Sequence, residues 1–348
     1  MDHSYDISGV LPPPDMSNEA KGVASRLGFG LLAYAGCAVA VVFLTQMIIS
    51  LAFGIDVYAG LSENIYFVWG VQVLSMYVIA LPIFFLVTRS LPKQKCEAKG
   101  ISLGEFTATF LVSEAVMTVG SMISTYVVAI ISSLVGHEVV DKTSEVIMQT
   151  PLWLIILVAV VIGPLVEELI FRHGLIPALR VYGDRFAIVV SAIAFGIFHG
   201  NFSQIVYATG IGLVLGYVYT KTGSVKYSFL LHMLMNFFGT VPTIMLGDSV
   251  DNIAGLTEDM LLPEGEELGA FMLDLIKVMD VALLQYGLML GGVFMLFYAI
   301  KHKLIRIPSG ASVYVSREGL ARATLLNVGA ILFVIYCLAQ MLISVFVQ

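Results

Sequence analysis

The stretch PLVEELIFR, from Pro164 to Arg172, places ionisable side chains inside a long apolar run. Because ionised groups are expensive to hold in hydrocarbon, the adjacent carboxylates of Glu167 and Glu168 indicate a functional site if this run crosses a membrane. Neighbouring residues on a helix point about 100° apart, so we expect the two carboxylates to face different surroundings. Arg172 follows Glu168 by four residues, the favourable acid-before-base spacing. We therefore expect Arg172 to neutralise Glu168 and to leave Glu167 free for chemistry.

Composition places the chain among polytopic membrane proteins. Of its 348 residues, 58% are hydrophobic and 12% are charged, whereas soluble domains carry about 25% charged residues. An apolar run of roughly 17–25 residues can span a bilayer as a helix. The candidate runs are Leu27–Ile55, Tyr66–Thr88, Phe106–Val135, Leu152–Leu175, Phe186–Gly200, Gln204–Thr220, Tyr227–Leu246, Val281–Ile300 and Thr324–Val347. We predict an all-α helical bundle of about nine transmembrane helices.

Basic residues in the short loops predict the orientation of these helices. Lysine and arginine gather in alternate loops, at 89–99, 180–185, 221–226 and 301–322. This alternation predicts that the N-terminus lies in the cytoplasm and the C-terminus outside. The chain begins with a polar, proline-containing segment that lacks the pattern of a secretory signal. We expect a disordered cytoplasmic tail over residues 1–26 and a single transmembrane domain over 27–348, in the plasma (inner) membrane of a bacterium.

Some features of the apolar runs have structural interpretations. The fifth and sixth runs are short and are joined only by Asn201–Ser203, which predicts a tight helical hairpin. Gly212 and Gly216 form a GxxxG on the sixth run, and we expect them to allow close helix packing within the monomer. Glu114, in the third run, could pair with Arg172 or His173, but we expect it to be a solvated residue near the cytoplasmic interface.

Further polar side chains recur at helical spacing in the later runs. Phe195 and His199 share one face of the fifth run, and His232 and Asn236 share one face of the seventh. A lone histidine in such a helix is more often a packing residue than a catalyst. However, counting about 1.5 Å per helical residue from the basic loops places these groups and Glu167 around the membrane midplane. We therefore expect the side chains to converge into one polar cavity.

This set of side chains suits a hydrolytic reaction. A carboxylate and an imidazole beside one water molecule can deprotonate it. A second imidazole and a carboxamide can donate hydrogen bonds to a developing oxyanion. The set needs no serine, threonine or cysteine nucleophile and no cofactor. It indicates water-mediated amide hydrolysis inside the membrane.

The order of the polar motifs resembles that of a known family. The motifs are Glu167-Glu168-x-x-x-Arg172, Phe195-x-x-x-His199 and His232-x-x-x-Asn236. In this order they are similar to the CPBP family, the CAAX prenyl endopeptidases of the Ras-converting type and their bacterial relatives, also called the ABI family. The resemblance covers a catalytic core of about residues 152–240. It implies an intramembrane glutamic endopeptidase that cuts a peptide or membrane-protein substrate within the membrane or near its cytoplasmic side.

The resemblance also implies a role for each motif residue. Glu167 with His199 would activate water, and His232 with Asn236 would form the oxyanion hole. Glu168 and Arg172 would support the site, and Phe195 would pack beside it. These assignments follow from the family pattern, because spacing alone does not distinguish the roles.

Other functions remain open at this point. Glu167, His199 and His232 offer two nitrogens and one carboxylate, a known catalytic zinc set, so a zinc-dependent intramembrane protease is an alternative. A non-enzymatic bacteriocin-immunity or transport-type membrane protein is another, because buried ionisable groups also relay protons or bind partners. The sequence points to the lipid bilayer and to no nucleic acid as partner, and it specifies neither the substrate nor the oligomeric state.

Overall fold

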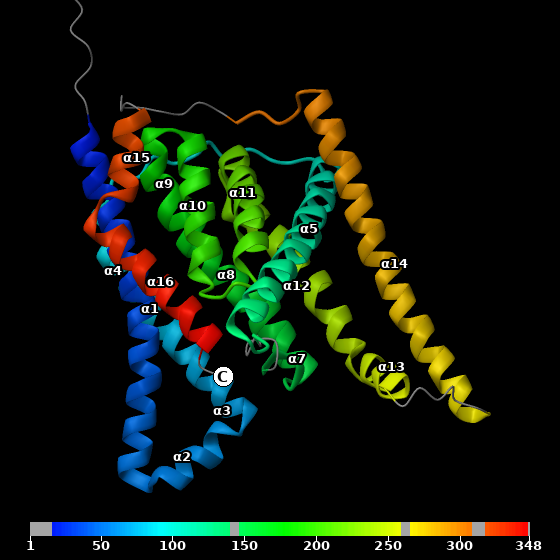
Figure 1. Ribbon diagram of the computed structural model, residues 1–348. Coiled ribbons are helices and arrows are strands. Elements are labelled where there is room, and N and C mark those ends of the chain that lie inside the picture. Colours follow the sequence, from blue (N-terminus) through cyan, green and yellow to red (C-terminus); the bar gives the residue numbers. More distant parts are fainter. Residues whose placement is uncertain (1–15, 140–145, 259–264, 308–316, 347–348) are drawn as a thin grey trace, which may run out of the picture.

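The computed structural model describes residues 16–139, 146–258, 265–307 and 317–346, and the regular structure in these ranges is entirely helical (Figure 1). Several of its helices are long and apolar enough to cross a bilayer: Ser17–Phe53, Ile65–Thr88, Leu103–Val135, Leu152–Tyr182, Val225–Met245, Glu267–Lys301 and Val328–Phe346. The prediction of an all-α, multi-pass membrane bundle is therefore confirmed.

The elements are joined by connections of different lengths, of which the α4–α5 link, residues 89–102, is a long one. In chain order they are α1 (Ser17–Phe53), α2 (Ile55–Ser62), α3 (Ile65–Val73), η1 (Leu74–Ala80), α4 (Leu81–Thr88), α5 (Leu103–Val135), α7 (Leu152–Ile155), η2 (Ile156–Ile162), α8 (Gly163–Glu168), η3 (Leu169–Leu175), α9 (Ile176–Leu179), η4 (Arg180–Tyr182), α10 (Asp184–Phe198), α11 (Ile205–Thr222), α12 (Val225–Met245), α13 (Gly247–Glu258), α14 (Glu266–Lys301), α15 (Arg317–Leu325) and α16 (Val328–Phe346). The segments η1, η2 and η3 are π-helical turns within longer membrane helices.

The predicted hairpin is formed by α10 and α11, which pack side by side. Their connection lies part-way down the bundle in Figure 1 rather than at its lower end. At 15 residues α10 rises about 22 Å, less than the roughly 30 Å of a hydrocarbon core. Among the described residues, each of the nine predicted runs contains a helix, but α10 and α11 are not among the seven helices long and apolar enough to span. The count of nine crossings and the orientation remain predictions.

The connections predicted to be cytoplasmic gather at one end of the bundle. The links α4–α5, η4–α10 and α11–α12 lie at the upper end in Figure 1, on the same side as the start of α1. If the α10–α11 hairpin enters and leaves the membrane on this side, the number of crossings falls from nine to seven and both ends of the hairpin stay on the same side. The alternation of basic loops therefore fits seven crossings as well as nine.

The predicted disordered tail is too long. Residues 1–15 lie outside the described ranges, but α1 begins at Ser17, and Ala20, Val23 and Ala24 are buried. With Leu27 they form an apolar stripe at helical spacing, which packs α1 against the bundle. The polar residues between them make the segment polar on average, so its composition does not show the stripe.

Close glycine packing sets the spacing of α10 and α11. A Cβ atom on Gly212 would lie 2.8 Å from the Cα atom of Ala192, and one on Gly196 would lie 2.9 Å from the carbonyl oxygen of Ile205. Only hydrogen side chains fit these positions. The expected role of the GxxxG in packing within the monomer is confirmed at Gly212.

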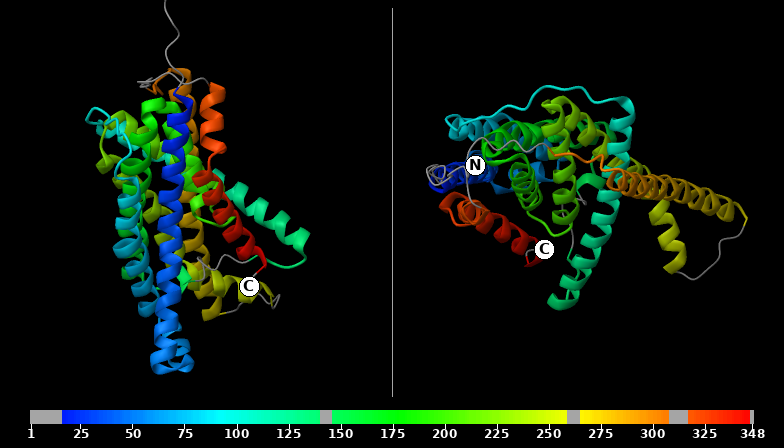
Figure 2. Two further views of the ribbon diagram at one scale, coloured as in Figure 1. Left: turned by 90° about the vertical axis from the view of Figure 1, so that its left-hand side faces the viewer. Right: turned by 90° about the horizontal axis from the view of Figure 1, so that it is seen from above.

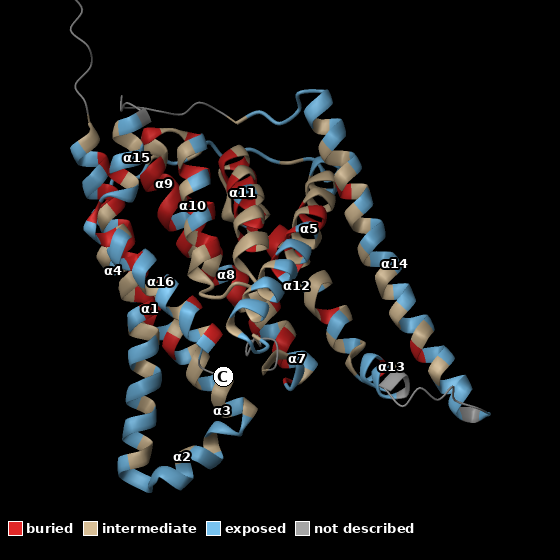
Figure 3. Ribbon diagram, viewed as in Figure 1, coloured by how far each residue is buried: buried red, intermediate tan, exposed pale blue. Residues whose placement is uncertain are grey.

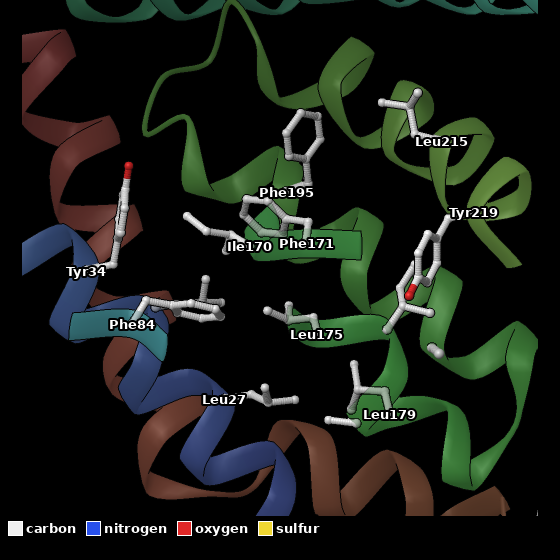
Figure 4. Close-up of a cluster of buried hydrophobic side chains, with 14 of the residues drawn as sticks. Leu27, Tyr34, Phe84, Ile170, Phe171, Leu175, Leu179, Phe195, Leu215 and Tyr219 are labelled. Atoms are coloured by element: carbon white, nitrogen blue, oxygen red, sulfur yellow. The ribbon is translucent and has the colours of Figure 1, made fainter. Parts of the chain in front are cut away.

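The apolar core lies where the α7–η4 helix meets its neighbours (Figure 3). Figure 4 shows side chains from α1, α4, η3, α9, α10 and α11 in this core: Leu27, Tyr34, Phe84, Ile170, Phe171, Leu175, Leu179, Phe195, Leu215 and Tyr219. Half of the apolar window of Leu152–Tyr182 is buried, compared with 6% for Glu267–Lys301. The helix that carries the paired glutamates is therefore at the centre of the protein.

The helix α14 lies at the edge of the bundle. Seen from above in Figure 2, its N-terminal part extends away from the other membrane helices. It approaches α5 closely at Gly292, where a Cβ atom would lie 2.6 Å from the carbonyl carbon of Leu111 and 2.7 Å from the side chain of Ala115. Glu114 belongs to this part of α5 and is 3% exposed. The expectation that Glu114 is solvated is therefore wrong, because α14 packs over the region that carries it.

Candidate active site

Two irregular stretches of one helix position the acidic motif. Glu167 and Glu168 are the last residues of α8, which is flanked by the π-helical segments η2 and η3. Pro164 at the start of α8 cannot donate a backbone hydrogen bond, which is compatible with the π turn before it. The turn after it places Arg172 within η3. Such π turns shift side chains around the helix and occur often at functional sites.

Glu168 and Arg172 form the buried ion pair that their spacing predicts. Glu168 Oε1 lies 3.2 Å from Arg172 Nη1, and neither side chain is exposed. The same carboxylate oxygen lies 3.1 Å from His232 Nδ1 on α12. Arg172 Nη2 also donates a hydrogen bond to the carbonyl oxygen of Gly212, at 3.5 Å. Arg172 thereby connects α8, α11 and, through Glu168, α12.

Glu167 contacts the opposite edge of the same imidazole. Its Oε2 atom lies 3.5 Å from His232 Nε2, and 26% of its side chain is exposed. The two glutamates were expected to face different surroundings, but they meet the two nitrogens of one histidine. His232 lies between the glutamates because α12 packs against α8 and presents its ring edge-on. Glu167 is the accessible carboxylate of the pair and Glu168 is the enclosed one.

The ring of Phe195 is the centre of the cluster. The guanidinium carbon of Arg172 lies 4.7 Å from its centroid, in cation–π geometry. The rings of His199 and His232 meet it edge-on, with centroids 4.9 Å and 5.7 Å away. Phe195 is 2% exposed, and it separates the two imidazoles while holding both in place.

A hydrogen bond fixes how His199 presents its ring. His199 Nδ1 lies 2.8 Å from the carbonyl oxygen of Phe195. A carbonyl oxygen only accepts hydrogen bonds, so Nδ1 carries the proton that is donated. In the neutral ring this leaves the lone pair on Nε2, which is the form needed to accept a proton from water.

Asn236 is held by a carbonyl group that a π turn exposes. Its Nδ2 atom donates to the carbonyl oxygen of Ala159, in η2, at 2.9 Å. A π turn changes the i→i−4 pattern locally, so a backbone carbonyl can accept a hydrogen bond from a side chain. A carboxamide has two N–H groups, so one can still be donated to a ligand.

The structure adds residues that the sequence reasoning did not find. Tyr34 on α1 and Tyr77 in η1 lie close enough to Glu167 to interact electrostatically with it. The Tyr77 hydroxyl would be 3.4 Å from a Cβ atom on Gly163, one helical turn before Glu167. Each tyrosine interrupts an apolar run, but tyrosine is so common in membrane helices that this signal alone would not have singled them out.

The zinc alternative gains no support from the arrangement of donors. Across the described ranges, no three or more His, Cys, Asp or Glu side chains are grouped closely enough to hold a metal ion. Glu167, His199 and His232 therefore do not form such a group.

The comparisons with known proteins point to the same class of protein. The profile of the Type II CAAX prenyl endopeptidase Rce1-like family matches residues 149–238, which contain all three motifs. The chain is 27% identical to YdiL of Bacillus subtilis, named as a membrane peptidase, over 184 residues, 51% of this chain and 72% of YdiL. It is 29% identical to the membrane-embedded CAAX protease MroQ of Staphylococcus aureus over 127 residues, 34% of this chain and 51% of MroQ. No solved structure matches the chain.

The apolar helices and the two bacterial relatives define the class: the chain is a multi-pass bacterial membrane protein. The family match and the names of the relatives support a membrane protease function. Within that class, the chain is similar to the CPBP family over the residues that carry its motifs.

Proposed function

We propose that the chain is an intramembrane glutamic endopeptidase, in which Glu167 and His199 activate the water that hydrolyses a peptide bond. The observation that carries this proposal is the different exposure of the paired glutamates. Glu168 is enclosed and paired with Arg172, whereas 26% of the Glu167 side chain is exposed beside a histidine. The family profile and the names of both relatives support a peptide bond as the target.

The proposed reaction begins with proton transfer from water. The Glu167 carboxylate accepts one proton, and His199 Nε2 orients the water molecule through a hydrogen bond. The oxygen of the water forms a bond to the carbonyl carbon of the substrate, and the π electrons of the carbonyl group move onto its oxygen. When the C–N bond breaks, the protonated Glu167 returns its proton to the departing amine.

His232 and Asn236 are proposed to stabilise the oxyanion. With a proton on each ring nitrogen, His232 donates to Glu168 through Nδ1 and directs Nε2–H toward the reaction. The second N–H of Asn236 is the other donor. One such donor contributes about 2.7–4 kcal/mol to the stability of the transition state.

Glu168 and Arg172 are proposed to act through His232. The Glu168 carboxylate fixes the position of the ring by accepting from Nδ1, at 3.1 Å. Arg172 offsets the charge of Glu168 and packs on Phe195, at 4.7 Å. Both residues position donors without contacting the scissile bond.

The test compares membrane proteomes of cells that carry wild-type protein, Glu167→Gln or Glu63→Gln. Glutamine keeps the size of the side chain but cannot accept the proton of water. We expect peptide fragments that form with wild-type protein and Glu63→Gln to disappear with Glu167→Gln, at equal amounts of protein in the membrane. Glu63 is an exposed residue at the end of α2 and serves as the control. Unchanged fragments with Glu167→Gln would refute the proposal.

Metal content is tested on the purified protein. The proposal predicts less than stoichiometric zinc and no loss of cleavage after treatment with a chelator. Stoichiometric zinc that is lost together with activity would favour the alternative set of Glu167, His199 and His232.

A further inference from the structure

A cavity of about 490 Å³ adjoins the cluster on the side away from the basic loops. Its walls come from α1, the α3–η1 junction, the α10–α11 connection and α16. His199 lies in its lining, and so does Tyr34, which interacts electrostatically with Glu167. Figure 4 shows Tyr34 at the edge of the buried cluster, with its hydroxyl directed away from Leu27 and Leu179. The cavity therefore reaches the proposed catalytic groups through His199 and Tyr34.

The cavity exists because two helices cross and then separate. Near the start of α16, Gly28 of α1 and Gly329 of α16 bring the two backbones into contact, and Ser25 Oγ accepts a hydrogen bond from the Gly329 amide at 3.2 Å. Further along, both helices contribute residues to opposite walls of the cavity. The α10–α11 connection enters between them: a Cβ atom on Gly200 would lie 3.2 Å from the Cβ atom of Gln340.

The lining of the cavity is uncharged and combines carboxamides with a larger share of apolar side chains. Carboxamides from three helices line it: Gln46 of α1, Gln72 of α3 and Gln340 of α16. The lining contains no Lys, Arg, Asp or Glu. Carboxamide groups are costly within a membrane unless they find hydrogen-bond partners. The nearest acceptor of Gln72 Nε2 is the sulfur of Met76, at 2.6 Å, and a thioether is a weak acceptor.

Neutral amides are complementary to a neutral amide. Each glutamine side chain offers both a donor and an acceptor, the same pair that a peptide bond offers. An extended peptide inside a membrane lacks the internal hydrogen bonds of a helix and needs such partners. A phosphate or carboxylate headgroup would instead favour Lys or Arg, and an acyl chain would leave the carboxamides of Gln46, Gln72 and Gln340 without hydrogen-bond partners.

We propose that this cavity binds an extended segment of the peptide substrate and leads it to His199. The proposal rests on the proposed function and specifies its substrate as an unwound, uncharged stretch of polypeptide. The walls from α1 and α16 lie outside the matched residues 149–238. Substrate choice therefore depends on helices that flank the catalytic core.

The experiment fills the cavity with a bulky side chain from either of two helices. It then measures the peptide fragments whose formation depends on Glu167. Gln340→Trp on α16 and Val39→Trp on α1 each place an indole in the cavity. The matched controls are Leu342→Trp and Ile48→Trp on the same helices, at side chains that are 54% and 60% exposed and lie outside the lining. We expect both cavity variants to lose the fragments and both controls to keep them, at equal amounts of membrane protein.

A second pair of variants tests the chemistry of recognition without adding bulk. Gln46→Leu and Gln340→Leu each remove a carboxamide, and we expect roughly a fivefold loss of fragments for each hydrogen bond removed. If the tryptophan variants fold poorly, the leucine variants decide the question. Normal cleavage by Gln340→Trp, Val39→Trp and both leucine variants would overturn the cavity proposal alone. If no fragment depends on Glu167, the proposed function fails and this proposal fails with it.

Discussion

The helix Leu152–Tyr182 and the helix α14 are similar in length and apolar character but differ in their place in the protein. They contain 31 and 35 residues in their membrane spans, with mean hydropathy 2.5 and 1.8. Half of the apolar window is buried in the first and 6% in the second. The length of the apolar run predicts that both helices insert into the membrane. It does not predict which helix holds ionisable groups at a site, because that depends on contacts with other helices.

The polar groups of the two helices have different partners. In the central helix, Glu168 and Arg172 are fully buried and contact each other, and Glu168 also contacts His232. In α14, Asp274 accepts hydrogen bonds from Ser249 and Asn252 of α13, at 2.8 and 2.9 Å. The central contacts assemble a site from several helices, whereas the outer contacts attach one short helix to the end of another.

The largest expected difference between the two helices concerns their basic residues. Arg172→Met leaves the Glu168 carboxylate buried without its cation, and we expect a loss of about 3–5 kcal/mol of stability. Lys301→Met, at the exposed end of α14, should cost less than about 1 kcal/mol. Thermal unfolding of the purified variants in detergent measures both.

A double variant separates charge from packing. Replacing both partners, with Glu168→Leu and Arg172→Met, removes the uncompensated charge, so it should be more stable than Arg172→Met alone. Equal stability of Arg172→Met and wild-type protein would mean that the central ion pair does not hold the bundle together.

The same substitution at two glycines sharpens the comparison. Gly212→Val inserts atoms at a position where even a Cβ atom would lie 2.8 Å from Ala192, and we expect a loss of about 1–3 kcal/mol. Gly287→Val, in α14, meets nothing within 4 Å among the described residues and should be tolerated. Unfolding temperatures of the two variants test this, and a reversed order would contradict the packing of α10 against α11.

The smallest effect is expected at the outer end of α14. Asp274→Ala removes the acceptor of Ser249 and Asn252, so α13 should open more readily while global stability falls by about 1 kcal/mol or less. Hydrogen exchange of the amides in α13 measures this opening. The control is Asp280→Ala, at an exposed residue of α14, the helix that also carries Asp274. If the α13 amides exchange as slowly in Asp274→Ala as in the wild-type protein, other contacts hold α13 in place.

The sequence predicted the parts of this fold that depend on local spacing. The apolar runs located the helices, and the i,i+4 spacing of Glu168 and Arg172 predicted their ion pair. The few residues at Asn201–Ser203 predicted the α10–α11 hairpin. Each of these features is determined within one helix or between consecutive helices, where sequence distance reflects spatial distance.

The rotation of helices about their axes could not be predicted in this way. His232 meets both glutamates because of how α12 packs against α8, and Glu114 is buried because α14 covers α5. The π turns that position Arg172 and expose the Ala159 carbonyl were not predicted, because a nearby proline such as Pro164 does not by itself distinguish a π turn from a kink or an ordinary helix start. The cavity beside His199 depends on how α1 and α16 separate, which involves opposite ends of the chain.

The most direct test of the central claim is an experimental structure of the protein in a lipid bilayer that resolves ordered water near Glu167. The account predicts a water molecule within hydrogen-bond distance, about 2.6–3.2 Å, of both the Glu167 carboxylate and His199 Nε2. A Glu167 side chain directed toward lipid, or a His199 ring that shares no solvent with it, would contradict the account.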